Sequence, residues 1–237
     1  AELELQILLK QFEEWSKENS GGFKDFLKSK DDNPVRTIKL NSGGPVSSNA
    51  PIEEYGDLID AWVRKIDVLV NNAGTNLPEP FLKVKKSSLE MLLEVNTKAA
   101  FNVAKLCTDK MLKLRNRKKV GGSIIHTSSM FGLVGGPNRT VYSMTKFGIE
   151  GLTKGMAVDL AKYNIRVNSV CPTFVATPRA KKYLADKKFN KYALNNIPLG
   201  RIATESDVAT AITFLSSNAA SMITGTNIII DGGWTAK

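Results

Sequence analysis

Residues 66–74 read Ile-Asp-Val-Leu-Val-Asn-Asn-Ala-Gly, and this stretch decides how the rest of the chain is interpreted. Its apolar part is typical of a β-strand that is covered on both faces of a parallel sheet. Segments of helical length separate it from three similar runs, and this alternation predicts an α/β fold with a doubly wound parallel sheet. The further strands are expected at Gly122–Thr127, Ile165–Cys171 and Asn227–Asp231.

Helices are expected between these strands. Ser87 and Glu90 have the spacing of a capping box, in which the serine caps the helix and the glutamate reaches back. They predict the start of a helix that runs to Met111. The other helices are expected over Val141–Tyr163 and from Thr204-Glu-Ser-Asp207 to about Ser217.

The first 65 residues follow a different pattern. Apolar residues between Leu5 and Trp15 recur at helical spacing and predict a helix. A strand is expected at Val35–Leu40, and a helix around Ile52–Arg64. We interpret residues 1–237 as a single domain. Residues 1–65 are its atypical, incomplete or divergent N-terminal part, and residues 66–237 are its core.

The composition suits one globular domain and narrows the function classes. No apolar run approaches the roughly 20 residues that a membrane helix needs, so no membrane partner is expected. Two cysteines imply no disulfide framework and favour a reducing, cytoplasmic location. His126 is the single histidine, and no metal site is expected.

The net charge of +10 is concentrated in residues 105–119 and 179–191. Such stretches can attract an anionic ligand or nucleic acid, or they can be solvated faces of helices and loops. Neither stretch interleaves aromatic residues in the way that a base-stacking platform would. We therefore favour solvated faces and expect no nucleic-acid partner.

Tyr142 and Lys146 form the strongest chemical pattern. Their spacing of four residues places a phenol and an ammonium on one face of a helix. A free tyrosine has a pKa of about 10, too high for proton exchange at neutral pH. An ammonium about 4 Å away can lower that pKa by about 3, which would make Tyr142 a general acid or base.

Ser129 follows the strand predicted at Gly122–Thr127, at the carboxyl end where open α/β sheets place their sites. Its hydroxyl can hydrogen-bond a substrate oxygen and stabilise the charge that develops there. The alternative is that Ser128 and Ser129 only cap the turn that follows.

These patterns occur in an order that resembles the short-chain dehydrogenase/reductase family. Asn71-Asn-Ala-Gly74 follows a strand, Asn96 lies in Val-Asn-Thr on the next helix, and the serine and the tyrosine–lysine pair come after it. The resemblance covers about Asp57 to Lys237. Its later motifs are Ile165-Arg-Val-Asn-Ser-Val170, Cys171-Pro-Thr-Phe-Val-Ala-Thr177, Thr224-Gly-Thr226 and Asp231-Gly-Gly233.

The resemblance implies a Rossmann-like fold and a nicotinamide cofactor, NAD or NADP. It implies that Tyr142 exchanges a proton with the substrate oxygen, which Ser129 orients. Lys146 would lower the pKa of Tyr142 and hydrogen-bond the nicotinamide ribose, and Asn96 would hold a water of a proton relay. The cofactor-binding residues would be Tyr142 and Lys146 with Asn72, Ala73, Gly74, Pro172 and Thr177.

One motif of the family is missing. The turn T-G-x-x-x-G-x-G, whose backbone binds the pyrophosphate, is absent, and no G-x-G precedes Ile66. Asn41-Ser-Gly-Gly-Pro45 is a poor substitute, because its helix leads directly into the strand at Ile66. Either the first strand, the turn and the second strand are missing from this chain, or they have diverged beyond recognition.

The expected function is NAD(P)-dependent interconversion of a secondary alcohol and a ketone. Sugars or polyols, small diketones and 3-oxoacyl thioesters all remain open as substrates. Pro172-Thr173, where the family usually has Pro-Gly, resembles the sugar-acting branch such as the xylulose reductases. The alternative is a catalytically inactive scaffold that binds no cofactor. The missing turn favours that alternative, and the intact catalytic set argues against it.

The resemblance also implies a homodimer or homotetramer, built through the two long helices and the C-terminal strand region. The segment Phe174–Pro198 has many charged residues and few glycines. We expect it to be a lid over the substrate.

Overall fold

The computed structural model describes residues 66–113 and 121–236, and these contain one parallel sheet with the order β1-β2-β3-β4. Helices link successive strands, as parallel pairing requires. The predicted α/β fold with a parallel sheet is confirmed for this part of the chain. The strands are β1 (Val68–Asn71), β2 (Gly122–Thr127), β3 (Ile165–Pro172) and β4 (Asn227–Ile230).

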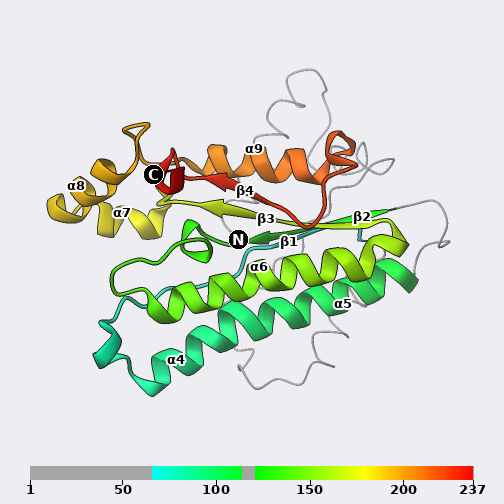
Figure 1. The fold of residues 1–237 in the computed structure, drawn as a ribbon, viewed down its shortest axis with the longest axis horizontal. Coiled ribbons are helices and arrows are strands. Elements are labelled where there is room, and N and C mark those ends of the chain that lie inside the picture. The colour runs from blue at the N-terminus through cyan, green and yellow to red at the C-terminus, as the bar shows by residue number, and fades with distance from the viewer. Residues whose placement is uncertain (1–65, 114–120, 237) are drawn as a thin grey trace, which may run out of the picture.

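The helices of the described ranges are α4 (Lys86–Leu93), α5 (Ala99–Lys113), α6 (Thr140–Leu160), α7 (Pro178–Leu184), α8 (Lys187–Asn196) and α9 (Glu205–Ser216). In Figure 1, α5 and α6 lie on one side of the sheet and α9 lies on the other, and α7 and α8 project beyond one end of the strands. The sheet is therefore covered on both faces, as the near-continuous hydrophobicity of its strands predicted.

The strand register explains where the core ends and a polar region begins. On the face covered by α5 and α6, one row across the sheet is apolar and comprises Leu69, Ile124 and Val167. The next row lies two residues further along each strand, toward the carboxyl ends. It is polar and comprises Asn71, His126, Ser169 and Asn227.

The helix predicted over Ser87–Met111 differs from the observed one. It begins at Lys86, and no side chain caps its N-terminus, so the capping box at Ser87 and Glu90 is wrong. Glu90 instead pairs with Lys86 at 3.7 Å. A π-helical turn at Glu94–Lys98 then separates α4 from α5. Such turns occur frequently at functional sites.

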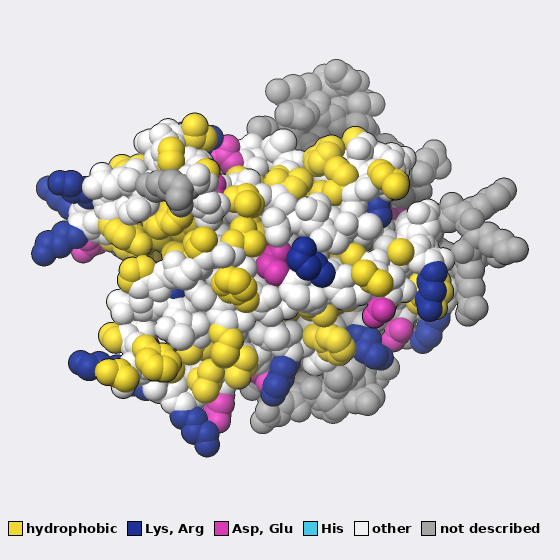
Figure 2. Space-filling view, in the orientation of Figure 1, with side chains coloured by type: hydrophobic (Ala, Val, Ile, Leu, Met, Phe, Trp, Pro, Cys, Tyr) yellow, Lys and Arg dark blue, Asp and Glu magenta, His cyan; other side chains and the backbone are white. Residues whose placement is uncertain are grey.

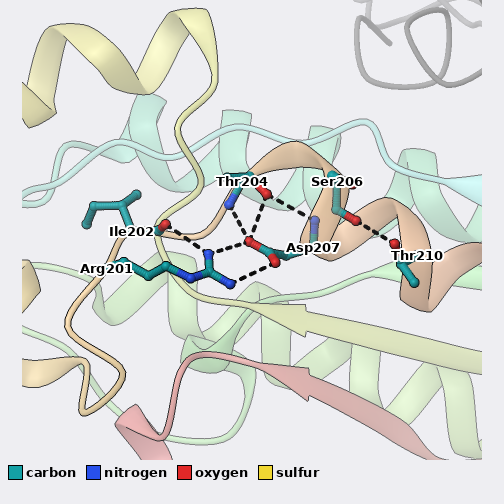
Figure 3. A network of polar contacts seen from close by, with 6 residues as sticks. All are labelled: Arg201, Ile202, Thr204, Ser206, Asp207 and Thr210. Atoms are coloured by element: carbon teal, nitrogen blue, oxygen red, sulfur yellow. Dashed lines mark hydrogen bonds and ion pairs between the residues drawn. The ribbon is translucent and has the colours of Figure 1, made fainter. Parts of the chain in front are cut away.

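The helix predicted to start at Thr204 and Asp207 is confirmed, and these two residues form a capping box at its N-terminus. Figure 3 shows Arg201 adding two hydrogen bonds to the Asp207 carboxylate, at 2.7 and 2.9 Å. These bonds and those from Thr204 hold the pKa of Asp207 far below its usual range. The strand predicted to end at Asp231 stops one residue earlier, because the Asp231 carboxylate accepts hydrogen bonds from Gly233 and Thr235 in a turn.

The elements predicted within residues 1–65, including the loop Asn41–Pro45, lie outside the described residues, so the division of residues 1–237 into these two parts stays a prediction. In the ranges that are described, no helix is long and apolar enough to cross a membrane. The same ranges contain no group of side chains that could hold a metal ion.

Candidate active site

The catalytic pattern lies at the carboxyl edge of the sheet. Ser129 follows β2, and Tyr142 and Lys146 occupy the first two turns of α6, which packs against β3. The Lys146 side chain is almost fully buried, whereas Tyr142 is partly exposed. Because the two residues share one helix face, the phenol lies nearer to solvent and the ammonium lies one turn deeper.

Lys146 is held by the strand below it. Its Nζ donates a hydrogen bond to the Thr127 carbonyl oxygen at 2.8 Å and lies 5.7 Å from the centre of the Tyr142 ring. Burial lowers the pKa of Lys146 to about 8, against a smaller opposing effect from Cys171 and Glu150. The ammonium is therefore protonated at neutral pH with little margin.

The pKa of Tyr142 shifts in the direction opposite to the sequence-based expectation. Burial raises it, and the Ser129 side chain and the Arg139 charge oppose that rise. The physical reason is that desolvation of the phenolate outweighs the nearby positive charge. The expected effect of Lys146 on the pKa of Tyr142 stays a prediction.

Of the two functions that the sequence left open for Ser129, the structure shows the cap, and the contact with a substrate oxygen stays a prediction. Its Oγ accepts a hydrogen bond from the Phe131 backbone at 3.2 Å and so caps the turn that follows. The same hydroxyl also stabilises the phenolate form of Tyr142. It therefore lies where one oxygen of a substrate could contact both hydroxyls.

Asn96 lies in the π-helical turn and is 1% exposed. Its Nδ2 donates to the Thr75 carbonyl at 2.8 Å and to Thr145 Oγ1 at 3.1 Å, and its Oδ1 accepts from the Thr75 backbone at 2.8 Å. Asn96 thus ties the loop after β1 to α6. Its Oδ1 keeps a second lone pair, so the predicted water-binding function stays a prediction.

Gly74 lies where this loop approaches Lys146. A Cβ placed on it would lie 3.4 Å from Asn96 Oδ1 and 3.5 Å from Lys146 Nζ. Ala73 and Gly74 are exposed, so the loop presents a small, open backbone beside an ammonium. This arrangement suits the approach of a cofactor ribose and supports the predicted cofactor site.

The remaining predicted cofactor residues lie on loops or strand ends of the same sheet. Asn72 and Ala73 precede Gly74 directly, and Pro172 is the last residue of β3. Thr177 caps α7, because its Oγ1 accepts a hydrogen bond from the Ala180 backbone at 3.1 Å. Its hydroxyl proton remains available to another group.

Glu150 was missed by the sequence reasoning. It lies one turn beyond Lys146 on α6 and is 7% exposed. Its carboxylate accepts hydrogen bonds from Ser169 Oγ at 3.0 Å and Asn227 Nδ2 at 3.1 Å. The signal was present in the sequence, because positions 142, 146 and 150 repeat at the spacing of one helix face.

Aromatic side chains link the segment Phe174–Pro198 to Tyr142. The Phe131 ring lies 6.4 Å from Tyr142 and 6.3 Å from Phe174, measured between ring centres. Trp234 lies 5.7 Å from Phe174 and 5.7 Å from Tyr192 of α8. Residues distant in sequence thus form one apolar wall beside the phenol.

Comparison with known proteins assigns the family. A short-chain dehydrogenase family model, described as enoyl-(acyl carrier protein) reductase, matches residues 36–235. The chain belongs to the short-chain dehydrogenase/reductase family. The family match begins at residue 36, which lies further toward the N-terminus than the motifs of this short-chain dehydrogenase/reductase alone indicated.

Several oxidoreductases of this family are similar to the chain. The 3-oxoacyl-[acyl-carrier-protein] reductase of Thermotoga maritima is 39% identical over 188 residues, which span 79% of this chain and 74% of that protein. The L-xylulose reductase of Bos taurus is 38% identical over 174 residues, 73% of this chain and 70% of that one. The structure of a gluconate 5-dehydrogenase from Burkholderia cenocepacia, in complex with NADP and tartrate, has a TM-score of 0.73 at 30% identity and covers 78% of this chain and 71% of its own.

Proposed function

We propose that this short-chain dehydrogenase/reductase uses NAD or NADP to interconvert a secondary alcohol and a ketone, of a sugar, polyol or other small carbonyl compound. The observation that carries the proposal is the convergence of Ser129, Tyr142 and Lys146 at one edge of the sheet, beside the open backbone of Gly74. The names of the xylulose and gluconate relatives support the sugar class.

A nicotinamide cofactor held at this site would supply or accept the hydride. In ketone reduction Tyr142 gives the proton to the substrate oxygen, and in alcohol oxidation it takes that proton back. Ser129 donates a hydrogen bond to the same oxygen. Because burial raises the pKa of Tyr142, the phenol is protonated at neutral pH, which is the state that ketone reduction needs.

The residues that would hold the cofactor are those of the loop after β1 and the ends of β3 and α7. Lys146 would contact the nicotinamide ribose, because its ammonium lies next to Gly74. Asn96 acts as a positioning residue for that loop. The cofactor set comprises Asn72, Ala73, Gly74, Tyr142, Lys146, Pro172 and Thr177.

Titration with NADH and NADPH, followed by cofactor fluorescence, tests the proposal first. Saturable binding at micromolar concentration, with turnover of at least one ketone that Tyr142→Phe abolishes, is the expected result. The absence of binding at millimolar cofactor would contradict it and favour the inactive scaffold.

We also propose that the partner of this chain is a second copy, as a homodimer or homotetramer. Large apolar side chains are exposed on α5 and α6, namely Phe101 at 50%, Phe147 at 49% and Val158 at 80%. Packing of these helices against another copy would cover them. Light scattering on wild type and Phe147→Lys tests this, and a monomeric wild type would contradict it.

The segment Phe174–Pro198 is proposed as the substrate lid. It carries α7 and α8, and its Phe174 and Phe189 rings pack with their centres 5.0 Å apart. A cytoplasmic location stays a prediction.

A further inference from the structure

Arg139 lies beside the proposed catalytic tyrosine and has no ion-pair partner among residues 66–113 and 121–236. It immediately precedes α6 and lies three residues before Tyr142. Its Nε is buried and has no hydrogen-bond partner. The ion pairs of the described residues do not include it. A guanidinium that is partly removed from water and left unpaired is unfavourable, so this position favours an anion.

The surroundings of Arg139 are phenolic rather than acidic. Burial lowers the pKa of Arg139, and the nearby phenols of Tyr142, Tyr192 of α8 and Tyr183 of α7 oppose that shift only when they ionise. Arginine remains protonated at neutral pH in spite of such a shift. The guanidinium therefore lies between the catalytic phenol and the lid helices, with its charge uncompensated by the described carboxylates.

The backbone around Arg139 is adapted to this placement. Asn138 has a φ of 58°, in the left-handed region that asparagine tolerates better than most residues. α6 has neither a side-chain cap nor an acidic residue in its first turn. The positive end of its dipole adds to the potential of Arg139 instead of being neutralised.

The lid carries charge of the same sign. α7 and α8 contain exposed lysines at positions 181, 182, 187, 188 and 191, against a single acidic residue between them, Asp186. Figure 2 shows Lys and Arg side chains gathered at the end of the molecule where these helices lie. Such a surface raises the local concentration of anions and speeds their association.

We infer that Arg139 binds an anionic group of the substrate, a carboxylate or a phosphate, while the substrate's alcohol or ketone oxygen contacts Tyr142. This inference rests on the proposed function and deepens it by naming the charge class of the substrate. The planar guanidinium fork suits bidentate recognition of either group. The lysines of the lid attract the anion, and Arg139 fixes its orientation.

Substrates that differ in charge test the inference. Sorbitol, gluconate and sorbitol 6-phosphate form one set, and 2-pentanone and 4-oxopentanoate form a second. Wild type is expected to prefer an anionic member by about tenfold or more in kcat/KM. Arg139→Gln should lose that preference through a rise in the KM of the anionic member, and the KM of NADPH should not change. A preference for gluconate or 4-oxopentanoate would identify the bound group as a carboxylate, and a preference for sorbitol 6-phosphate would identify it as a phosphate.

Two variants serve as controls. Arg139→Lys keeps the positive charge but loses the bidentate guanidinium, so it should retain part of the preference for anionic substrates. It also provides a readout if Arg139→Gln does not fold. Lys182→Gln removes an exposed lid charge and should change the preference little. Thermal unfolding of each variant separates substrate effects from loss of structure.

The inference and the proposed function fail in different ways. Turnover without an anionic preference, or a preference that Arg139→Gln retains, overturns the inference and leaves the proposed function standing. A rise in the KM of NADPH alone overturns it too, because Arg139 would then bind cofactor. If no substrate is turned over, calorimetry with gluconate, sorbitol 6-phosphate and 4-oxopentanoate decides. Weaker binding to Arg139→Gln than to wild type supports the inference, and equal or absent binding overturns it.

Discussion

The two faces of the sheet are covered by helices of opposite character. The buried residues of α9 are all apolar, namely Val208, Ala209, Ile212 and Leu215. Those of α6 are mostly polar or charged, and Ile149 and Ala157 are the only apolar ones among them. Both helices pack on β3. The comparison therefore separates burial that stabilises the fold from burial that serves chemistry.

The difference follows from the energetics of burial. Removing apolar surface from water contributes about 25 cal/mol per Å², which is what α9 does with β2 and β3. A buried polar group stabilises only when it is hydrogen-bonded. Lys146 and Glu150 have such partners, whereas both ring nitrogens of His126 have none. Burial on the α6 face therefore contributes less to the free energy of unfolding than burial on the α9 face, and this is the face that carries the candidate site.

Tyr142→Phe should have the largest effect and should act on chemistry alone. Removal of the hydroxyl removes the proton donor and acceptor, so kcat is expected to fall by about 10³-fold or more. The urea midpoint should barely change. Tyr163→Phe, on a tyrosine that follows the same helix, is the control and should keep full activity. Activity of Tyr142→Phe within tenfold of wild type would contradict the assignment.

Leu215→Ala should show the opposite pattern on the α9 face. This side chain is fully buried, and its truncation should lower the free energy of unfolding by about 2–5 kcal/mol. The kcat of the protein that remains folded should not change. Urea unfolding and kinetics below the transition are the measurements. Loss of kcat in fully folded Leu215→Ala would show that the two faces are not separable.

His126 should make the α6 face sensitive to acid. Burial lowers its pKa from 6.5 to about 4, so the unfolded chain binds more protons than the folded one between these values. The free energy of unfolding should therefore fall as the pH drops from 6.5 to 4, by up to about 3 kcal/mol. His126→Leu should remove this contribution. Denaturant unfolding of both proteins at several pH values measures this contribution. The same dependence of the free energy of unfolding on pH in wild type and His126→Leu would contradict the prediction.

Glu150→Gln should produce the smallest effect. The Glu150 charge helps to keep the pKa of Lys146 as high as about 8, so its removal should lower that pKa further. The alkaline limb of kcat/KM should then move to lower pH, by about one unit or less. Glu90→Gln on the exposed surface is the control. An unchanged limb would mean that Glu150 only holds Ser169 and Asn227.

Short sequence patterns predicted correctly those elements whose boundaries depend on contacts between residues close in sequence. β2 matches its prediction, and α9 starts where it was expected, because the bonds of its capping box join residues only three apart. The same pattern failed at Ser87, where α4 starts earlier and Glu90 pairs with Lys86 instead. A motif of this length cannot reveal which of two nearby contacts a glutamate makes.

The sequence by itself determined the family and the strand-helix alternation, and it proposed Ser129, Tyr142 and Lys146 as the catalytic set, because these follow from order and spacing along the chain. Only the tertiary structure decided the direction of the Tyr142 pKa and the isolation of Arg139. Both depend on how much water is excluded and on which groups from β3, α7 and α8 lie nearby. Desolvation is a property of the packed neighbourhood, so no spacing of residues encodes it.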